Sequence, residues 1–302
     1  MQSVDIVEVA PRDGLQNEPV TLPTPDKAEL IRLLASSGAR RIEATSFVNP
    51  ARVPQLADAD ALCALLPRDG ISWIALVLNE RGLDRAIQAA MDEVNMVVVA
   101  TDTFSQRNQG VTVSEAIATW TRIAGRARAA GLRTTVTIAA AFGCPFEGEV
   151  RPERVAETLD RCVQAQPDEV ALADTIGVGV PADVRTLADV AGDVAPGIPL
   201  RWHFHNTRNT GYANAITAAE LGAAALDASA GGIGGCPFAP AATGNIATED
   251  LLYLLARSGI QTGLSPTALF PAASLLTGAL GRPVPGLLSK AGTFPAQPDS
   301  PS

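Results

Sequence analysis

Residues 94–139 carry the pattern that decides the fold: VNMVVVATDTFSQRNQGVTVSEAIATWTRIAGRARAAGLRTTVTIA. Two apolar runs, 94–100 and 133–139, flank an amphipathic stretch at 114–130. Short apolar runs of this kind are typical of strands that are covered on both faces of a parallel sheet. Two parallel strands need a returning connection, which is usually a helix. The segment therefore predicts a strand–helix–strand unit.

The same unit recurs along the whole chain. Predicted strands lie near 4–9, 40–46, 72–78, 94–100, 133–139, 169–173, 200–205 and 225–229. Helical patterns between them include 152–165 and 25–37, the latter with Thr24 as its expected N-cap and Pro25 as its first helical residue. Eight alternations predict an α/β fold, a (β/α)₈ TIM barrel. A doubly wound open sheet is the alternative, which periodicity alone does not reject.

The residues after the eighth predicted strand extend the barrel. Patterns at 247–257 and 266–281 predict extra C-terminal helices, and the last 20 residues are rich in Pro, Gly and Ser. We expect one TIM-barrel catalytic domain over 1–282, including these helices, and a flexible tail over 283–302. The first residues show no signal-peptide pattern, and no apolar run is long enough to span a membrane. With four scattered cysteines, this predicts a cytoplasmic protein.

The composition narrows the classes of partner. Hydrophobic residues make up 47% of the chain, which is enough for a large core. The net charge of −9 argues against binding a nucleic-acid backbone, which requires clustered Lys and Arg. Neither a nucleic-acid nor a membrane partner is expected. Local basic side chains remain able to hold an anionic small molecule.

The two histidines are the most informative residues. The chain has only two, His203 and His205, and they stand two positions apart at the end of a predicted strand. Side chains at i and i+2 of a strand point to the same face, so both imidazoles can reach one ion. A pair of ordinary core or surface histidines is the alternative. Carboxylates at the ends of neighbouring strands favour the metal site.

A cation held by two histidines requires at least one carboxylate. Asp13 ends the first predicted strand, on the same rim as the seventh, and is the natural candidate, although Asp-Gly is also a common turn pair. Asn245 or Asn206 could add a carbonyl oxygen. Mixed nitrogen and oxygen ligands suit Mg²⁺ or Mn²⁺, and sometimes Co²⁺ or Zn²⁺. Ligand type does not choose among these metals.

Four further residues are candidates for the chemistry. Arg12 adjoins Asp13 and could stabilise a developing enolate, or could simply pair with Asp13. Glu43 lies inside an apolar run, where an unpaired carboxylate is costly, and so is expected to orient Arg12. Asp174 could be a base, a supporting residue or a helix cap. Cys236 lies within the glycine-rich segment 231–238 and could donate a proton on loop closure, but a lone cysteine is more often inert.

Five longer segments resemble hydroxymethylglutaryl-CoA lyases. They are VEVAPRDGLQNE, IEATSFVNPARVPQLAD, FGCPFEG, ADTIGVGVP and GGIGGCPFAPAATGNIATEDLLYLL, in order and at matching spacing from about residue 4 to 260. The resemblance implies a (β/α)₈ barrel, a divalent cation, and retro-Claisen cleavage of a 3-hydroxyacyl-CoA to acetyl-CoA and a keto acid. It also implies an acyl-CoA partner and a homodimer.

The resemblance assigns roles residue by residue. It marks Asp13, His203, His205 and Asn245 as metal ligands. It implies that Arg12 neutralises the enolate oxygen with support from Glu43, that Cys236 handles a proton, and that Asp174 is an acid, a base or a substrate contact.

The sequence departs from the family pattern near the substrate. The departures are Asn206 for an acid, Arg208 for Tyr, Thr137 for Tyr, Ala139 for Ser and Ala171 for Ser. They favour a 3-hydroxyacyl group related to, but different from, hydroxymethylglutaryl. Two rivals stay open, namely a Claisen-type carboligase or aldolase of the same superfamily, and an inert metal-binding barrel.

Overall fold

The computed structural model describes residues 2–68, 70–235 and 244–295, and within them eight parallel strands close into a barrel in chain order. The strands are β1 (Asp5–Glu8), β2 (Arg41–Ser46), β3 (Ser72–Leu76), β4 (Glu93–Val99), β5 (Arg133–Ala139), β6 (Glu169–Asp174), β7 (Leu200–Phe204) and β8 (Ala225–Ala228). Closure is direct, because β1 pairs with β8 with Asp5 opposite Ala225. The predicted TIM barrel is confirmed, and the open sheet is wrong.

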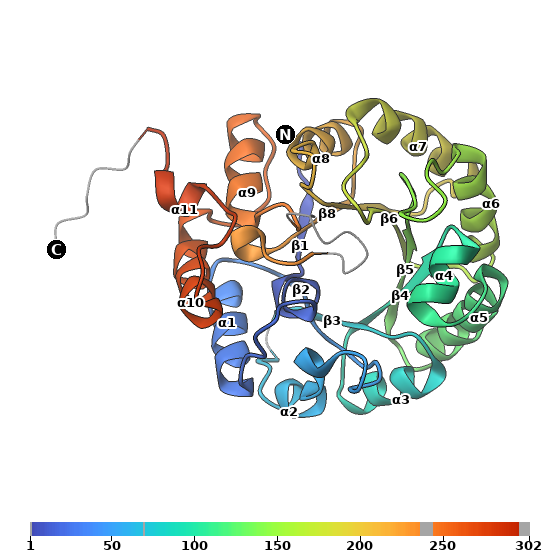
Figure 1. Ribbon diagram of the computed structural model, residues 1–302, viewed down its shortest axis with the longest axis horizontal. Helices are drawn as coiled ribbons and strands as arrows, with labels where there is room; N and C mark the ends of the chain where they lie inside the picture. The colour runs from blue at the N-terminus through green and yellow to red at the C-terminus, as the bar shows by residue number, and fades with distance from the viewer. Residues whose placement is uncertain (1, 69, 236–243, 296–302) are drawn as a thin grey trace.

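Helices form a ring around the barrel, as Figure 1 shows. They are α1 (Thr24–Ser36), α2 (Ala59–Cys63), α3 (Glu80–Gln88), α4 (Asp102–Gln109), α5 (Val113–Ala129), α6 (Pro152–Val163), α7 (Pro181–Val194) and α8 (Gly211–Glu220). The core fills the space between strands and helices, where Leu34, Trp120 and Leu159 have no exposed surface. In the described part of the chain, no helix is long and apolar enough to cross a membrane.

The start of α1 differs from the expectation in one detail. The helix begins at Thr24, and the Thr24 hydroxyl donates to Oδ2 of Asp58 at 2.7 Å instead of capping the helix. Asp58 also pairs with the buried Lys27 ammonium at 2.6 Å. A tertiary partner therefore outcompetes the local cap, which sequence-local reasoning cannot detect.

The barrel interior is charged at the end where the strands begin. Arg41 pairs with both Glu93 and Glu169 at 2.8 Å, and the hydroxyl of Thr135 donates to Glu93 at 2.9 Å. Arg201, which has no exposed surface, lies 3.7 Å from Glu169. Several strands that read as apolar runs thus carry charged side chains on their inward face. The apolar part of the barrel faces the helices.

Three helices follow the barrel: α9 (Thr248–Arg257), α10 (Phe270–Leu280) and α11 (Leu288–Ala291). The sequence placed the last of these in a flexible tail. Instead, the carboxylate of Asp250 accepts hydrogen bonds from the backbone of Leu287 and Leu288, and the backbone N–H of Gly286 donates to the carbonyl of Gly231. Val284 packs against Gly231 and is 2% exposed. The chain is therefore anchored through residue 291.

Candidate active site

The metal-ligating candidates converge at the end of the barrel where the strands finish. His203 lies in β7 and His205 directly after it, and one ligand atom from each lies within 4.8 Å of the others and of an Asp13 oxygen. Nε2 of His203 is 3.9 Å from Oδ2 of Asp13. The alternation of side chains along β7 thus brings both imidazoles to one side, as expected.

A turn of π-helix, Ala10–Gly14, places Arg12 and Asp13 over the barrel. The backbone N–H of Gly14 closes the turn on the carbonyl of Val9 at 3.1 Å. A Cβ on Gly14 would lie 2.8 Å from Oγ of Ser229 and 2.9 Å from Ile233. Glycine is therefore required for the turn to approach the segment after β8, and this approach sets the position of Asp13.

Glu8 anchors the same turn from below. Its carboxylate accepts hydrogen bonds from the N–H of Ala10 at 2.9 Å, the N–H of Ala230 at 3.0 Å and the hydroxyl of Thr248 at 2.7 Å. Burial raises the pKa of Glu8 to about 7, although these three donors act against that rise. Glu8 therefore ties together the chain segments that follow β1, follow β8 and begin α9.

Arg12 is held between two carboxylates. Its Nε donates to Glu43 at 2.7 Å, and its Nη1 donates to Oδ1 of Asp13 at 2.7 Å. Glu43 is fully buried and also accepts from Nδ2 of Asn95 at 3.2 Å, and the hydroxyl of Thr137 donates to Oδ1 of Asn95 at 2.8 Å. Glu43 thus pairs directly with the Arg12 guanidinium. Its position in an apolar strand is explained by this pairing.

The two oxygens of Asp13 face different partners. One accepts from Arg12, and Oδ2 accepts from Nδ2 of Asn245 at 2.9 Å. Burial opposes ionisation, but Arg12 and the two histidines hold the pKa of Asp13 well below its usual range. Asp13 is therefore ionised at neutral pH, the form in which a carboxylate can bind a metal.

The pKa values of the two histidines are shifted in opposite directions. Burial, together with the neighbouring His203, lowers the pKa of His205 to about 4, so that its imidazole is neutral at pH 7. Burial acts in the same direction on His203, but Asp227 and Asp13 raise the pKa of His203 above its ordinary value. Nδ1 of His205 is buried and has no hydrogen-bond partner among the described residues. A buried nitrogen without a hydrogen-bond partner costs free energy. One ring nitrogen of His205 lies within 4.8 Å of ligand atoms of Asp13 and His203, an arrangement that fits a divalent cation.

Asn245 lies at the site with its amide nitrogen toward Asp13. That nitrogen also donates to the carbonyl of Ile233 at 3.1 Å, and the backbone of Asn245 pairs with His205. Asn206, the alternative ligand, instead accepts from the backbone of Gly211 at 3.2 Å. The structure brings Asn245 to the predicted cluster and directs Asn206 to its own loop.

Two other predicted residues have different surroundings. The carboxylate of Asp174 accepts from the backbone N–H groups of Val178 and Gly179, each at 2.9 Å, and it does not line the cavity. Burial raises the pKa of Asp174. The contacts are those of a residue that anchors the loop after β6. Cys236 lies outside the described residues, and the preceding Gly235 lines the cavity.

Arg208 does not line the cavity either. Its Nη1 donates to the carbonyls of Ile176 at 3.1 Å and Gly177 at 2.9 Å, which joins the loop after β7 to the loop after β6. The departures at Thr137 and Ala139 do reach the cavity, while Ala171 is absent from its lining. Of the altered positions, those on β5 are therefore the ones in reach of a substrate.

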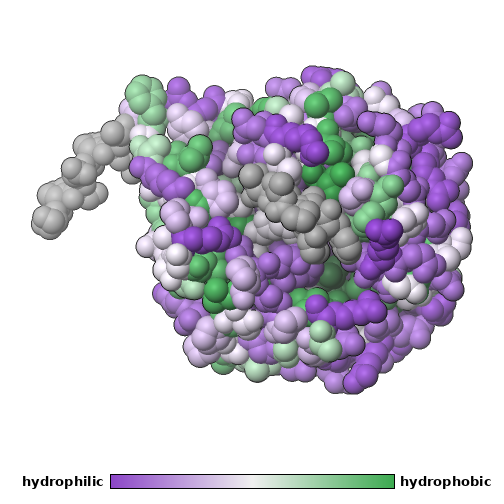
Figure 2. Space-filling view, in the orientation of Figure 1, coloured by the Kyte–Doolittle hydropathy of each residue, from purple (hydrophilic) through white to green (hydrophobic). Residues whose placement is uncertain are grey.

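The cavity above the candidate ligands has a volume of about 300 Å³. Figure 2 shows the hollow near the middle of this face of the molecule, with hydrophobic residues at its edge. Its polar end carries Arg12, Asp13, His203 and His205, and its apolar wall includes Val97 and Phe104. Such a cavity can hold a small ligand that has both a polar and an apolar part.

Sequence reasoning missed Asp227, which is buried and lines the cavity. Oδ2 of Asp227 lies 3.0 Å from Nδ1 of His203, and its other oxygen accepts from Nε of Arg201. Asn95 was missed as well. The signal was present in both cases, since each is a polar residue inside an otherwise apolar strand. The same reasoning that singled out Glu43 applies to them.

Comparison with known proteins agrees with this geometry. The model of the HMGL-like family matches residues 3–276. The chain is 45% identical over 303 residues to an (R)-citramalyl-CoA lyase of Chloroflexus aurantiacus, which covers 97% of this chain and 96% of that protein. It is 39% identical over 282 residues to the mitochondrial hydroxymethylglutaryl-CoA lyase of Bos taurus, covering 93% and 87%.

Solved structures give the same result. A hydroxymethylglutaryl-CoA lyase from Acinetobacter baumannii, in complex with coenzyme A and 3-methylmalate, matches with a TM-score of 0.92 at 37% identity, covering 99% of this chain and 98% of that one. The hydroxymethylglutaryl-CoA lyase of Pseudomonas aeruginosa matches with a TM-score of 0.92 at 36% identity, covering 96% and 97%. The resemblance read from the motifs is confirmed, and the chain belongs to the HMGL-like family.

Proposed function

We propose that this protein is a divalent-metal-dependent lyase that cleaves the C2–C3 bond of a 3-hydroxyacyl-CoA, releasing acetyl-CoA and a keto acid. The observation that carries the proposal is the convergence of Asp13, His203 and His205 within 4.8 Å, in the lining of a cavity that Arg12 also lines. Family membership and the names of the relatives support the same reaction class.

The ligand set favours a hard or borderline cation. Asp13, His203 and His205 would hold it, with Asn245 next to them as the fourth candidate. When bound, a divalent cation supplies a Lewis acid that makes the substrate hydroxyl more acidic. Mg²⁺ and Mn²⁺ are the proposed metals, because nitrogen and oxygen donors without thiolate suit both.

Residues of this chain are assigned to two of the charge movements in the cleavage. A base removes the C3 hydroxyl proton, the C3–O bond becomes a carbonyl, and the C2–C3 electron pair passes to the thioester as an enolate. The Arg12 guanidinium is positioned to neutralise the enolate oxygen, since Glu43 fixes its direction. Protonation at C2 then gives acetyl-CoA, and we assign that proton transfer to Cys236. Asp174 is proposed to act through the loop that it anchors.

The acyl group is proposed to be a branched 3-hydroxy acid with a free carboxylate. Citramalyl-CoA and hydroxymethylglutaryl-CoA are the two thioesters named by the relatives. We favour citramalyl-CoA, whose carboxylate is one carbon closer to the carbinol. Thr137 and Ala139 make the β5 wall of the cavity differ from the family pattern, and the citramalyl-CoA lyase is 45% identical to this chain.

The proposal is tested by following acetyl-CoA release from both thioesters, with EDTA and with Mg²⁺ or Mn²⁺ added back. Metal-dependent cleavage, faster with citramalyl-CoA, is the expected result. Faster cleavage of hydroxymethylglutaryl-CoA would overturn the substrate assignment. Free CoA formed only from acetyl-CoA plus a 2-oxoacid would overturn the lyase assignment in favour of a carboligase. A cytoplasmic location and a homodimer stay predictions, to be checked by fractionation and by sedimentation.

A further inference from the structure

The cavity has a second arginine that the reaction outlined above does not use. Arg52 lines the cavity with Arg12, but the two differ in their partners. Arg12 is held by Glu43 and Asp13, whereas the exposed Arg52 guanidinium makes no hydrogen bond or ion pair among the described residues. Asp227, another charged group of the lining, is paired with Arg201. Arg52 is thus a cation at the cavity whose counter-ion the described part of the chain does not supply.

The segment that carries Arg52 is well fixed. The backbone N–H of Arg52 donates to the carbonyl of Asn49 at 2.9 Å, and the side chain of Asn49 accepts from the N–H of Ala51 at 3.0 Å. Further along, the carboxamide of Gln55 donates to the carbonyl of Glu18 at 2.7 Å, and Lys27 donates to the carbonyl of Gln55. A cation on such a turn is held near the cavity by the backbone.

Apolar residues share the cavity lining with Arg52. Val53 follows it in the chain, and Val48, Leu76 and Leu78 line the same cavity. An anion bound to Arg52 would make a charge-assisted hydrogen bond, which is stronger than one between neutral groups. Because the chain has a net charge of −9, an anionic ligand gains most from a cation that it contacts directly.

Resting on the proposed function, we propose that Arg52 binds an anionic oxygen group of the thioester substrate and so contributes to substrate selection. Two groups share this chemistry, the carboxylate of the acyl part and a phosphate of CoA. Arg52 is a binding residue in this assignment, and it takes no part in bond cleavage. Its removal should therefore raise KM more than it lowers kcat.

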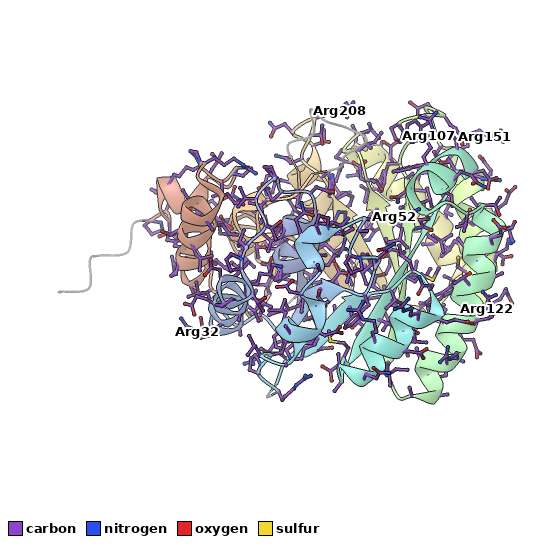
Figure 3. The ribbon with its side chains drawn as sticks, turned by 60° about the horizontal axis from the view of Figure 1, so that its bottom comes forward. Arg32, Arg52, Arg107, Arg122, Arg151 and Arg208 are labelled. Carbon is purple, nitrogen blue, oxygen red and sulfur yellow. The ribbon has the colours of Figure 1, made fainter. Side chains whose placement is uncertain are left out.

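Arg151 provides a matched control. Arg52, Arg107, Arg151 and Arg208 all lie in the upper half of Figure 3, whereas Arg32 and Arg122 lie in the lower half. Arg151 is exposed, makes no ion pair among the described residues and does not line the cavity. Arg151→Gln thus removes the same charge without changing the cavity. Comparing it with Arg52→Gln separates the loss of a direct ligand contact from the effect of the protein's overall charge.

The experiment compares Arg52→Gln, Arg52→Lys and Arg151→Gln with the wild type, on citramalyl-CoA and on its phosphate-free N-acetylcysteamine thioester. Arg52→Gln should raise KM for the CoA thioester about tenfold with kcat changed less than threefold. Arg52→Lys should recover part of the loss, and Arg151→Gln should match the wild type. A defect that persists with the truncated thioester assigns the acyl carboxylate, and one that disappears assigns a CoA phosphate.

Binding calorimetry keeps the two proposals separable. If the wild type cleaves neither citramalyl-CoA nor hydroxymethylglutaryl-CoA, the proposed function fails, but Kd values for citramalyl-CoA and for free CoA still test Arg52. Equal Kd values for Arg52→Gln, Arg151→Gln and the wild type with both ligands would overturn the Arg52 assignment. Circular dichroism spectra confirm that the variants are folded.

Discussion

Oδ2 of Asp227 lies 3.0 Å from Nδ1 of His203, and this contact leaves Nε2 of His203 directed at Asp13, 3.9 Å away. The other oxygen of Asp227 accepts from Arg201, which in turn lies 3.7 Å from Glu169 in the charged interior of the barrel. The orientation of a proposed metal ligand is therefore linked to the ion pairs beneath it.

Replacing Asp227 with Asn should weaken metal binding. The amide no longer neutralises Arg201, and its hydrogen bond to His203 is weaker, so the imidazole loses its fixed orientation. We expect a loss of roughly 10- to 100-fold in Mn²⁺ affinity, measured by calorimetry. Glu169→Gln is the control, because it removes a carboxylate from the same buried network without contacting His203. Equal Mn²⁺ affinities for the two variants would contradict a positioning role for Asp227.

Removing the metal should abolish acetyl-CoA release. Dialysis against EDTA is expected to inactivate the wild type, and Mg²⁺ or Mn²⁺ should restore it. His203→Ala should remain inactive at millimolar metal, because it deletes one of three clustered ligands. Arg208→Ala serves as the control, since among the described residues its guanidinium donates to the carbonyls of Ile176 and Gly177 and it lies outside the cavity lining. Full activity of the EDTA-treated enzyme would refute the metal requirement.

Arg12 should affect the chemical step and leave ground-state binding largely intact. Arg12→Gln removes a preorganised donor from the enolate, so kcat should fall roughly 100- to 1000-fold. Glu43→Gln should cause a smaller fall, because Arg12 keeps its bond to Asp13 but loses one fixed partner. Steady-state kinetics on citramalyl-CoA measure both. A kcat for Arg12→Gln near that of the wild type would remove Arg12 from the mechanism.

Most of the fold could be predicted because its determinants are local. The apolar composition of runs such as 94–100 and 133–139 predicts strands, and the spacing between these runs predicts the returning helices. The site could be predicted where residue type is restrictive, as with the only two histidines of the chain. Asp13 followed from its place at the end of the first strand, on the same rim as the histidines. Glu43 followed because an unpaired carboxylate inside an apolar strand is costly.

The rest depends on contacts between distant segments. The sequence suggested that Arg208 affects substrate choice, but its guanidinium donates hydrogen bonds to the carbonyls of Ile176 and Gly177. The residues near Val284 looked like a tail, but Asp250 and Gly231 hold the chain that follows. In both cases the partner lies more than 30 residues away in the chain. Local composition does not report such partners.

The stability of the barrel should depend on pH through Glu8. Burial raises the pKa of Glu8 from 4.5 to about 7 in the folded protein, so the folded state binds a proton that the unfolded state releases above pH 4.5. The contribution of Glu8 to folding stability is therefore fully present below pH 4.5 and is lost as the pH rises toward 7. Glu8→Gln should remove this loss, because an amide is neutral at every pH.

The measurement is the free energy of unfolding by urea between pH 5 and 8, in EDTA so that metal binding does not intervene. From pH 5 to pH 8, the free energy of unfolding of Glu8→Gln should rise by about 2 kcal/mol relative to that of the wild type, whatever the absolute stability of the variant. Glu220 is exposed at the end of α8, and the free energy of unfolding of Glu220→Gln should differ from that of the wild type by the same amount at every pH. Burial lowers the pKa of His205, which makes stability rise with pH, opposite in sign to the effect of Glu8. Because His205 is present in both proteins, its effect cancels when the wild type is subtracted from Glu8→Gln. A Glu8→Gln difference that stays constant from pH 5 to 8 would mean that Glu8 is ionised throughout, held by its three donors against burial.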